Sequence, residues 1–211
     1  MSKIMIAIVF MSVVGVLFPP GAQAQQGDPW PTASQGPMDA REDWPDSRPV
    51  GQLTIPKIEL DEEIYAVHFH KIVVNGVEGV QPEVKPNNVG WQDHSSPALG
   101  TPGNTVLNGH HFENGTGVFR RLIELGENDA IAIENYVSGN THYYKVDETL
   151  ELLEVGAPVE ERIAHAQYLA ADTPDERVTT ITCDGPHSEY RFLTISRPHD
   201  DARAIYEQQA N

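Results

Sequence analysis

Short stretches in which apolar and polar residues alternate recur through most of the chain after about residue 50. Because successive side chains of a strand point to opposite faces, this alternation predicts half-buried β-strands. Turn residues separate the stretches, and Ser138-Gly-Asn140 is typical of a hairpin turn. The predicted strands are 52–58, 63–69, 104–108, 130–136, 141–147, 149–155, 178–182 and 190–196, with 88–91 as a short strand or a packed corner.

Helical spacing of apolar residues is confined to two segments. Residues 118–125 predict a short helix ended by a glycine, and residues 160–169 predict a second. Residues 74–103 hold several glycines and prolines, so they predict a long irregular connection. Pro56 predicts that 52–58 is an edge strand. Many short strands with few helices predict an all-β fold, either a barrel or a sandwich.

The two ends of the chain differ in composition from the strand-rich part. Residues 1–24 combine an apolar stretch with the small-residue site Ala22-Gln-Ala24, which predicts a signal peptide or an N-terminal membrane anchor. Residues 25–50 are rich in Gln, Gly, Pro, Ser and Asp and predict a flexible spacer. One domain is expected over 51–198, followed by a frayed tail at 199–211. This domain is expected outside the cytoplasm, either secreted or held on the outer face of the membrane.

The net charge is −17, from 31 acidic and 14 basic residues. This balance argues against binding to nucleic acid or to anionic membrane surfaces. No cofactor is predicted. The acidic residues could bind Ca²⁺, but the sequence names no ligands. The two imidazoles of His68-x-His70 have a spacing that metals use, yet no third ligand accompanies them, so no metal site is predicted.

Cys183 is the only cysteine, and it ends a β-branched run that begins at Arg177. No intramolecular disulfide can form, so the thiol is a buried hydrophobic residue, an intermolecular link or a reactive group. Arg191 opens the next predicted strand, and His110 ends an upstream one. Antiparallel pairing would put Cys183 and Arg191 at the same end of the sheet. Cysteine nucleophiles use such neighbours, since a histidine relays protons and a cation stabilises negative charge on the attacked carbonyl.

Four motifs, in this order, resemble those of the sortase family. They are Ile55-Pro-Lys-Ile58, Gly103-Asn-Thr-Val-Leu-Asn-Gly-His110, Val118-Phe-Arg-Arg-Leu-Ile-Glu-Leu125 with Asn128-Asp-Ala-Ile131, and Thr179-Thr-Ile-Thr-Cys183 followed by Arg191. The resemblance runs from about Gly51 to Arg197. It implies an all-β fold, the eight-stranded sortase barrel with a few short helices, and the activity of an extracytoplasmic cysteine transpeptidase.

The resemblance also implies roles for single residues. Cys183 would be the nucleophile, His110 the general acid and base, and Arg191 the group that holds the substrate carbonyl or the oxyanion. Three neighbours are expected to contact the substrate: His111, Thr182 and His187. Sortases cut a sorting signal of the Leu-Pro-x-Thr-Gly type between Thr and Gly, forming a thioester. The implied partners are therefore the sorting-signal peptide of an exported surface protein and an amine from a cell-wall precursor or a pilin.

The chain departs from the family's pattern at two places within the domain, and its cleavable-looking N-terminal signal differs from the retained anchor that is common in the family. Many sortases have arginine directly after the catalytic histidine, where this chain has His111, and Glu127-Asn-Asp129 stands where Gly-Asp is usual. Two other functions stay open from the residues alone. One is a different exported cysteine hydrolase, including an L,D-transpeptidase, which would want a Ser/His-x-Gly-Cys context for its cysteine. The other is a non-catalytic exported β-domain in which Cys183 is incidental.

Overall fold

The computed structural model describes residues 48–74, 77–85, 87–92, 98–112, 115–169, 173–185 and 189–211. The predicted segment 1–24, nearly all of the predicted spacer and His187 lie outside these residues. Among the described residues no helix is both long and apolar enough to cross a membrane.

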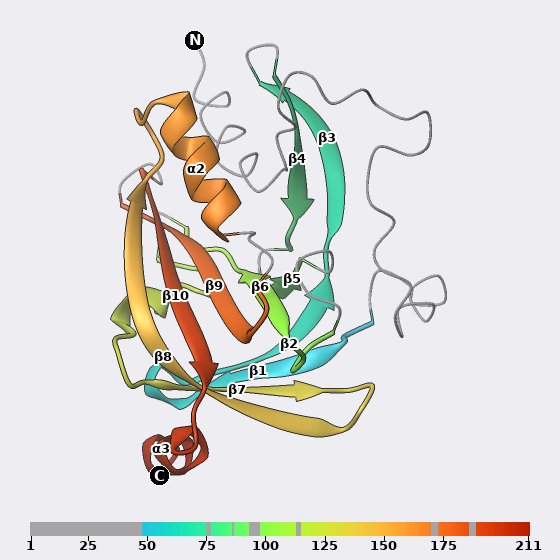
Figure 1. Cartoon of the computed structure of the whole chain (residues 1–211), viewed down its shortest axis with the longest axis vertical. Coiled ribbons are helices and arrows are strands. Elements are labelled where there is room, and N and C mark those ends of the chain that lie inside the picture. The colour runs from blue at the N-terminus through green and yellow to red at the C-terminus, as the bar shows by residue number, and fades with distance from the viewer. Residues whose placement is uncertain are drawn as a thin grey trace.

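Eight strands close into a barrel, which confirms the predicted all-β barrel fold (Figure 1). These strands are β1 Gly51–Ile55, β2 Leu60–Ala66, β5 Val89–Trp91, β6 Gly103–Asn108, β7 Ala130–Asn135, β8 Asn140–Leu153, β9 Glu176–Asp184 and β10 Tyr190–Pro198. Around the barrel the order is β1-β2-β5-β6-β9-β10-β8-β7. The pairs β2–β5 and β6–β9 are parallel and the others are antiparallel. The described helices are η3 Pro56–Ile58, η4 Leu122–Glu124, α2 Val159–Leu169 and α3 Ala202–Gln209.

Apolar side chains fill the barrel on the inside and also cover part of its outer face. The inner cluster includes the fully buried Leu53, Ile64, Phe119, Ile133 and Tyr144. A second cluster of Val106, Leu169, Ile181 and Leu193 joins the outer face of β6, β9 and β10 to the end of α2. Because β6 is covered on both faces, all six of its residues are buried, as is usual for strands covered on both sides. These three strands therefore have apolar packing on both faces of the sheet.

The irregular connection predicted for residues 74–103 is wrong over its first part. β3 His68–Val74 and β4 Val77–Glu83 form a separate antiparallel hairpin outside the barrel. Gly79 and Pro82 lower the strand propensity of β4, and this is why the sequence does not predict it. A two-stranded hairpin leaves one side of each strand unpaired, so Pro82, opposite Phe69, can be accommodated there without an N–H group.

The edge strand and the helix predicted nearby also need correction. β1 pairs with β2 on one side and with β7 on the other, so it is not an edge. Pro56 follows the strand and starts η3, a position where the missing N–H has no cost. The pairing of β1 with the following strand is confirmed. The helix predicted over 118–125 is reduced to η4.

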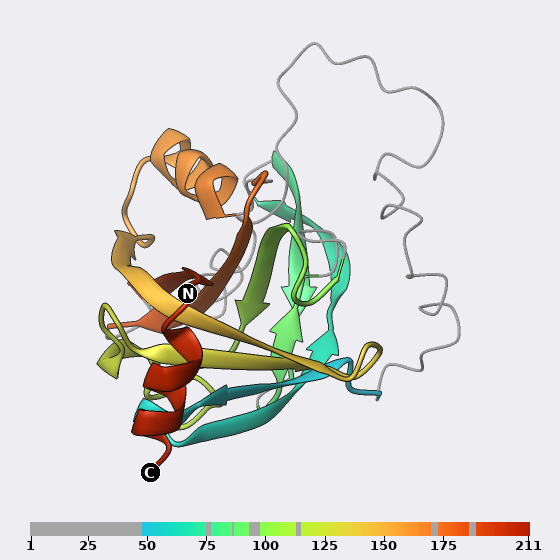
Figure 2. The same cartoon turned by 60° about the horizontal axis from the view of Figure 1, so that its bottom comes forward.

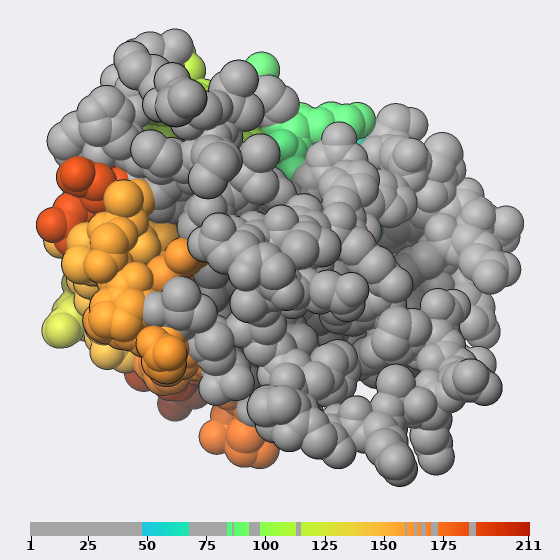
Figure 3. All heavy atoms as spheres, turned by 90° about the horizontal axis from the view of Figure 1, so that it is seen from above, coloured from blue at the N-terminus to red at the C-terminus, as the bar shows by residue number. Residues whose placement is uncertain are grey.

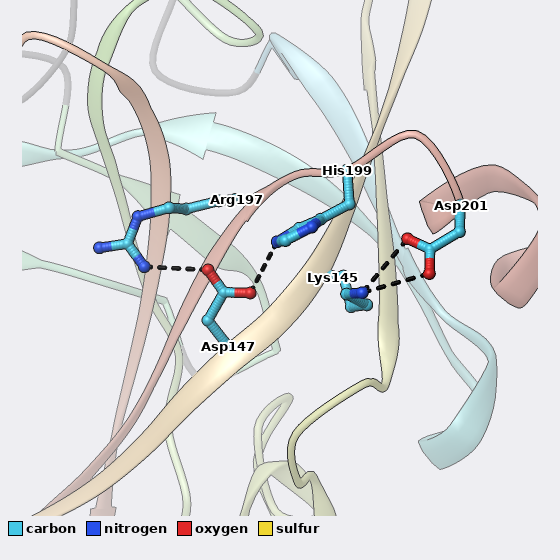
Figure 4. Close-up of polar contacts among 5 residues, drawn as sticks. All are labelled: Lys145, Asp147, Arg197, His199 and Asp201. Atoms are coloured by element: carbon cyan, nitrogen blue, oxygen red, sulfur yellow. Dashed lines mark hydrogen bonds and ion pairs between the residues drawn. The ribbon is translucent and has the colours of Figure 1, made fainter.

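The two strands predicted over 141–147 and 149–155 form the single strand β8, which ends at Leu153 and has a bulge next to the point where the prediction divided it. Opposite β10, Ile195 pairs with Glu148 and Ser196 with Val146, so Asp147 is an extra residue in the ladder. Its carboxylate accepts hydrogen bonds from Arg197 Nη1 at 2.9 Å and from His199 Nε2 at 2.7 Å (Figure 4). The bulge thus places a carboxylate where it binds the side chains at the end of β10 and just after it.

The tail predicted to be frayed forms α3 and packs against β7 and β8 (Figure 2). Ala202 is fully buried at its start. Lys145 on β8 binds Asp201 at 3.2 Å. At the other end Gln209 accepts from Ala130 N and donates to Asp129. The sequence fails to predict this because a single short helix of modest apolarity gains its stability from these tertiary contacts.

The backbone conformation of Asn128 explains why asparagine can stand where the family usually has the glycine of Gly-Asp. It has φ 70°, in the left-handed region that favours glycine and, next to it, asparagine. The backbone here is held from both sides, since Asn128 N donates to Val146 O and Gly126 N donates to Asp129 Oδ2. Asparagine therefore meets at this position the conformational requirement that glycine usually meets.

Candidate active site

Cys183 and Arg191 face each other across the pair of strands β9 and β10. They are direct Cα partners in the antiparallel ladder. Arg191 Nη1 lies 3.2 Å from Cys183 Sγ and also donates to Tyr190 O at 3.2 Å. Arg191 is 8% exposed, whereas Cys183 is partly exposed. The predicted pairing of the two residues is therefore confirmed, with a guanidinium in contact with the only thiol.

The parallel pair β6–β9 brings the histidine segment to the same end of the barrel. Asn108 is the Cα partner of Ile181, and Gly109 N continues the ladder by donating to Ile181 O at 3.2 Å. From there the chain runs alongside the last residues of β9 towards Cys183. This end is the start of β10 and lies opposite α3 (Figure 1).

His110 is held by three contacts that the sequence does not reveal. Its Nε2 lies 2.8 Å from the backbone oxygen of Val84, which directly follows β4. Its ring stacks on Phe112, with the centroids 4.8 Å apart and the planes inclined by 12°. Its backbone oxygen accepts from Phe119 N at 2.9 Å. The backbone and the ring of His110 are thus both fixed.

The ring of His111 contacts the backbone of Cys183. Its Nδ1 lies 3.1 Å from Cys183 O. His111 was expected to contact the substrate, and its ring does lie beside the nucleophile candidate. The contact is to the carbonyl group, whereas the described hydrogen bond to Sγ comes from Arg191.

Two glycines let the histidine segment approach its neighbours closely. A methyl group on Gly109 would lie 2.5 Å from the ring of Phe119, so a larger residue would push His110 out of place. Gly117 has φ 108°, and a methyl group there would overlap the backbone oxygen of His110. Both glycines therefore serve the placement of the histidine.

Thr182 was also expected to contact the substrate, but it is only 2% exposed. Its hydroxyl donates to Gly109 O at 3.0 Å. This places Thr182 behind the site, where it ties β9 to the residue before His110. His187, the third predicted substrate contact, lies outside the described residues.

The helix α2 is attached to the strands that carry the site residues. Seen from above, α2 is exposed on one side of this end of the molecule (Figure 3). Arg162 forms an ion pair with the buried Glu154 at 3.1 Å, close to the end of β8. At the other end of the helix, Asn104 Nδ2 donates to Leu169 O at 2.6 Å and Arg177 Nη2 donates to Tyr168 O at 3.2 Å.

Metal ligands are a separate question. Within the part of the chain that the structure describes, no group of three or more His, Cys, Asp or Glu side chains is placed to hold a metal ion. Binding of Ca²⁺ stays a prediction without named ligands.

Comparison with protein families gives a match to the sortase domain over residues 53–198. The chain belongs to the sortase family. Sortases are cysteine transpeptidases that in general act outside the cytoplasm in association with the membrane, so the chain is an enzyme of this class. A comparison with curated proteins gives no match.

Solved sortase structures share the fold at low sequence identity. A lid mutant of sortase A from Corynebacterium diphtheriae has a TM-score of 0.56 at 22% identity, covering 94% of this chain and 91% of that chain. The sortase D5 transpeptidase of Clostridium perfringens has a TM-score of 0.54 at 17% identity, covering 77% and 86%. Sortase C-1 from Actinomyces oris has a TM-score of 0.51 at 22% identity, covering 77% and 80%. At these identities the likeness shows the fold alone.

Proposed function

We propose that this sortase cleaves a C-terminal sorting signal of the Leu-Pro-x-Thr-Gly type and transfers the exported protein to an amine. Cys183 is the nucleophile, His110 the general acid and base, and Arg191 the cation that stabilises negative charge. The observation that carries the proposal is the 3.2 Å contact between Arg191 Nη1 and Cys183 Sγ in a sortase domain.

The first half of the reaction forms the thioester. The thiolate of Cys183 attacks the carbonyl carbon of the scissile peptide bond, and the charge moves to the carbonyl oxygen. The guanidinium of Arg191 is always protonated and has several donors, so it can bind first the sulfur and then the oxyanion. The carbon–nitrogen bond breaks, and His110 donates the proton that the leaving amine needs.

The second half transfers the protein. The amine of the acceptor attacks the thioester carbon while His110 takes a proton from its nitrogen. The carbon–sulfur bond then breaks and the Cys183 thiolate is restored. The acceptor is a cell-wall precursor or a pilin subunit. Residues 1–24 would keep the enzyme on the outer face of the membrane if they are retained, and would release it if they are cleaved.

Trapping of the thioester tests this function. Purified protein is incubated with a peptide that contains a Leu-Pro-x-Thr-Gly sequence, and intact mass spectrometry follows the adduct on Cys183. A second amine, such as triglycine, should convert the adduct into a transfer product. Cys183→Ala should give neither adduct nor cleavage. Cleavage by that variant, or a lack of reaction with every sorting peptide tried, would refute the function.

Two histidine variants test the assignment of the acid and base. His110→Ala should lower kcat by about 10²–10⁴-fold, the range that a general acid and base contributes. His111→Ala should lower activity much less, because its described contact is to Cys183 O. If His111→Ala shows the larger loss, the two histidines have been assigned the wrong way round.

A further inference from the structure

We propose that His110 exchanges its proton through Nδ1, because the backbone carbonyl of Val84 and the ring of Phe112 hold the imidazole with its other proton fixed on Nε2. The inference rests on the proposed role of His110 as acid and base. It adds the atom that carries the proton and two positioning groups, both outside the motifs that define the site in the sequence.

The contact to Val84 determines which nitrogen is protonated. His110 Nε2 lies 2.8 Å from Val84 O, and a peptide carbonyl can only accept a hydrogen bond. Nε2 must therefore donate. A neutral imidazole has one N–H group, so neutral His110 carries its lone pair on Nδ1. In the imidazolium both nitrogens are protonated, and the proton that comes and goes is the one on Nδ1.

The order of the strands agrees with this assignment of the two ring nitrogens. His110 follows β6, which lies between β5 and β9. Val84 lies on the β5 side, since a methyl group on Gly90 of β5 would come within 2.9 Å of Val84 Cγ2. Cys183 is on β9, the opposite neighbour. Nε2 is engaged on the side of β5, so Nδ1 is the nitrogen left for the side of the thiol.

Phe112 restrains the remaining freedom of the ring. The stacked arrangement, with 4.8 Å between the centroids and a 12° angle, opposes rotation about the bond between Cβ and the imidazole. Phe112 is held by its own backbone, which donates to Thr116 O and accepts from Gly115 N, both at 2.8 Å.

The proton balance follows directly. When Cys183 Sγ bonds to the substrate carbon, the carbon–nitrogen bond breaks and the proton on Nδ1 goes to the leaving nitrogen. When the acceptor amine attacks, its proton goes to Nδ1 and the carbon–sulfur bond breaks. The hydrogen bond from Nε2 to Val84 O is kept throughout, which is how a carboxylate orients the histidine of serine proteases, here with a neutral acceptor.

Long-range ¹H–¹⁵N NMR on histidine-labelled protein tests the tautomer without any substrate. The His110 signals are identified by their loss in His110→Gln. In its neutral form the ring should show a protonated, pyrrole-type Nε2 and an unprotonated, pyridine-type Nδ1. A ring protonated on Nδ1, or two averaged nitrogens, would overturn the proposal. That result is separate from the proposed function, which fails if His110→Ala still cleaves the peptide.

An amide-to-ester exchange tests the part played by Val84. Replacing Lys85 with its α-hydroxy analogue turns Val84 O into an ester carbonyl, which is a weaker acceptor. The expected result is a fall in kcat on the order of ten-fold with KM unchanged. A rise in kcat would show that Val84 holds His110 away from the thiolate, and would overturn the proposal.

Two side-chain variants complete the test. Gly90→Ala should displace the side chains of Val67 and Val84 and lower kcat, whereas the matched Gly126→Ala, where a methyl group meets nothing within 4 Å, should not. Phe112→Leu should lower kcat and bring the second tautomer into the NMR spectrum. Phe112→Tyr, which keeps an aromatic ring, should keep the kcat of the unaltered protein and its single tautomer. Equal kinetics of the leucine and tyrosine variants would remove Phe112 from the proposal.

Discussion

The variant Thr182→Val tests whether Thr182 places His110 in addition to stabilising β9. Valine has the shape of threonine, so no cavity forms, but the hydroxyl that donates to Gly109 O at 3.0 Å is lost. Both residues are buried, so a backbone acceptor is left without its partner, at a cost of about 1–3 kcal/mol. For a domain of this size Tm should fall by roughly 2–4 °C for each kcal/mol. Because Gly109 directly precedes His110, kcat should fall as well, by between about ten- and one-hundred-fold.

Thr180→Val is the matched control. Thr180 is on the same strand and the same inner face, is fully buried, and pairs its hydroxyl with that of Thr194 at 2.7 Å. Differential scanning fluorimetry should give similar losses of Tm for the two variants. In a fluorogenic assay of peptide cleavage only Thr182→Val should lose activity. If both variants or neither lose activity, Thr182 does not act through the placement of His110.

Three further outcomes concern the scaffold. Burial raises the pKa of Tyr144 above its ordinary value of 10.0, so the folded protein keeps a proton that the unfolded chain releases. This group should lower the free energy of unfolding by about 1.4 kcal/mol per pH unit above pH 10, and Tyr144→Phe should remove that slope in urea titrations. Asn128→Val should cost about 1–2 kcal/mol, because a β-branched residue resists a positive φ, whereas Asn128→Gly should keep or raise the urea midpoint. Asn104→Ala should speed amide hydrogen exchange in α2, because the hydrogen bond to Leu169 O is lost. Arg203→Ala removes an exposed ion pair within α3 and should leave exchange in α2 unchanged. Unaltered exchange in both variants would show that Asn104 does not anchor the helix.

The sequence predicts best those features that depend on neighbouring strands. The β-branched run before Cys183 and the apolar run after Arg191 predict β9 and β10, and a short connection between them requires antiparallel pairing. The register confirms that the two residues are partners. The strand that ends before His110 is equally clear, because the run Thr105-Val-Leu107 at its centre is β-branched or apolar, and every residue of the strand is buried.

Contacts that depend on the backbone or on distant segments could not be predicted. Val84 lies 26 residues before His110 and binds it through a carbonyl group that every residue possesses. The bulge at Asp147 breaks the alternation of β8, so one long strand resembles two short ones. Thr182 is polar and adjoins the nucleophile candidate, which suggests substrate contact, but its burial depends on the position of Gly109 in the closed barrel.

The ladder between β9 and β10 also bears on how the enzyme can diversify. Seven Cα pairs, from Asp184 with Tyr190 to Val178 with Ser196, set the spacing of Cys183 and Arg191. That spacing does not depend on the path that the chain takes between the two strands. Doubling the length of such a connection costs only about 0.6 kcal/mol in chain entropy. The joining residues can therefore be exchanged by loop grafting without changing how Cys183 and Arg191 face each other.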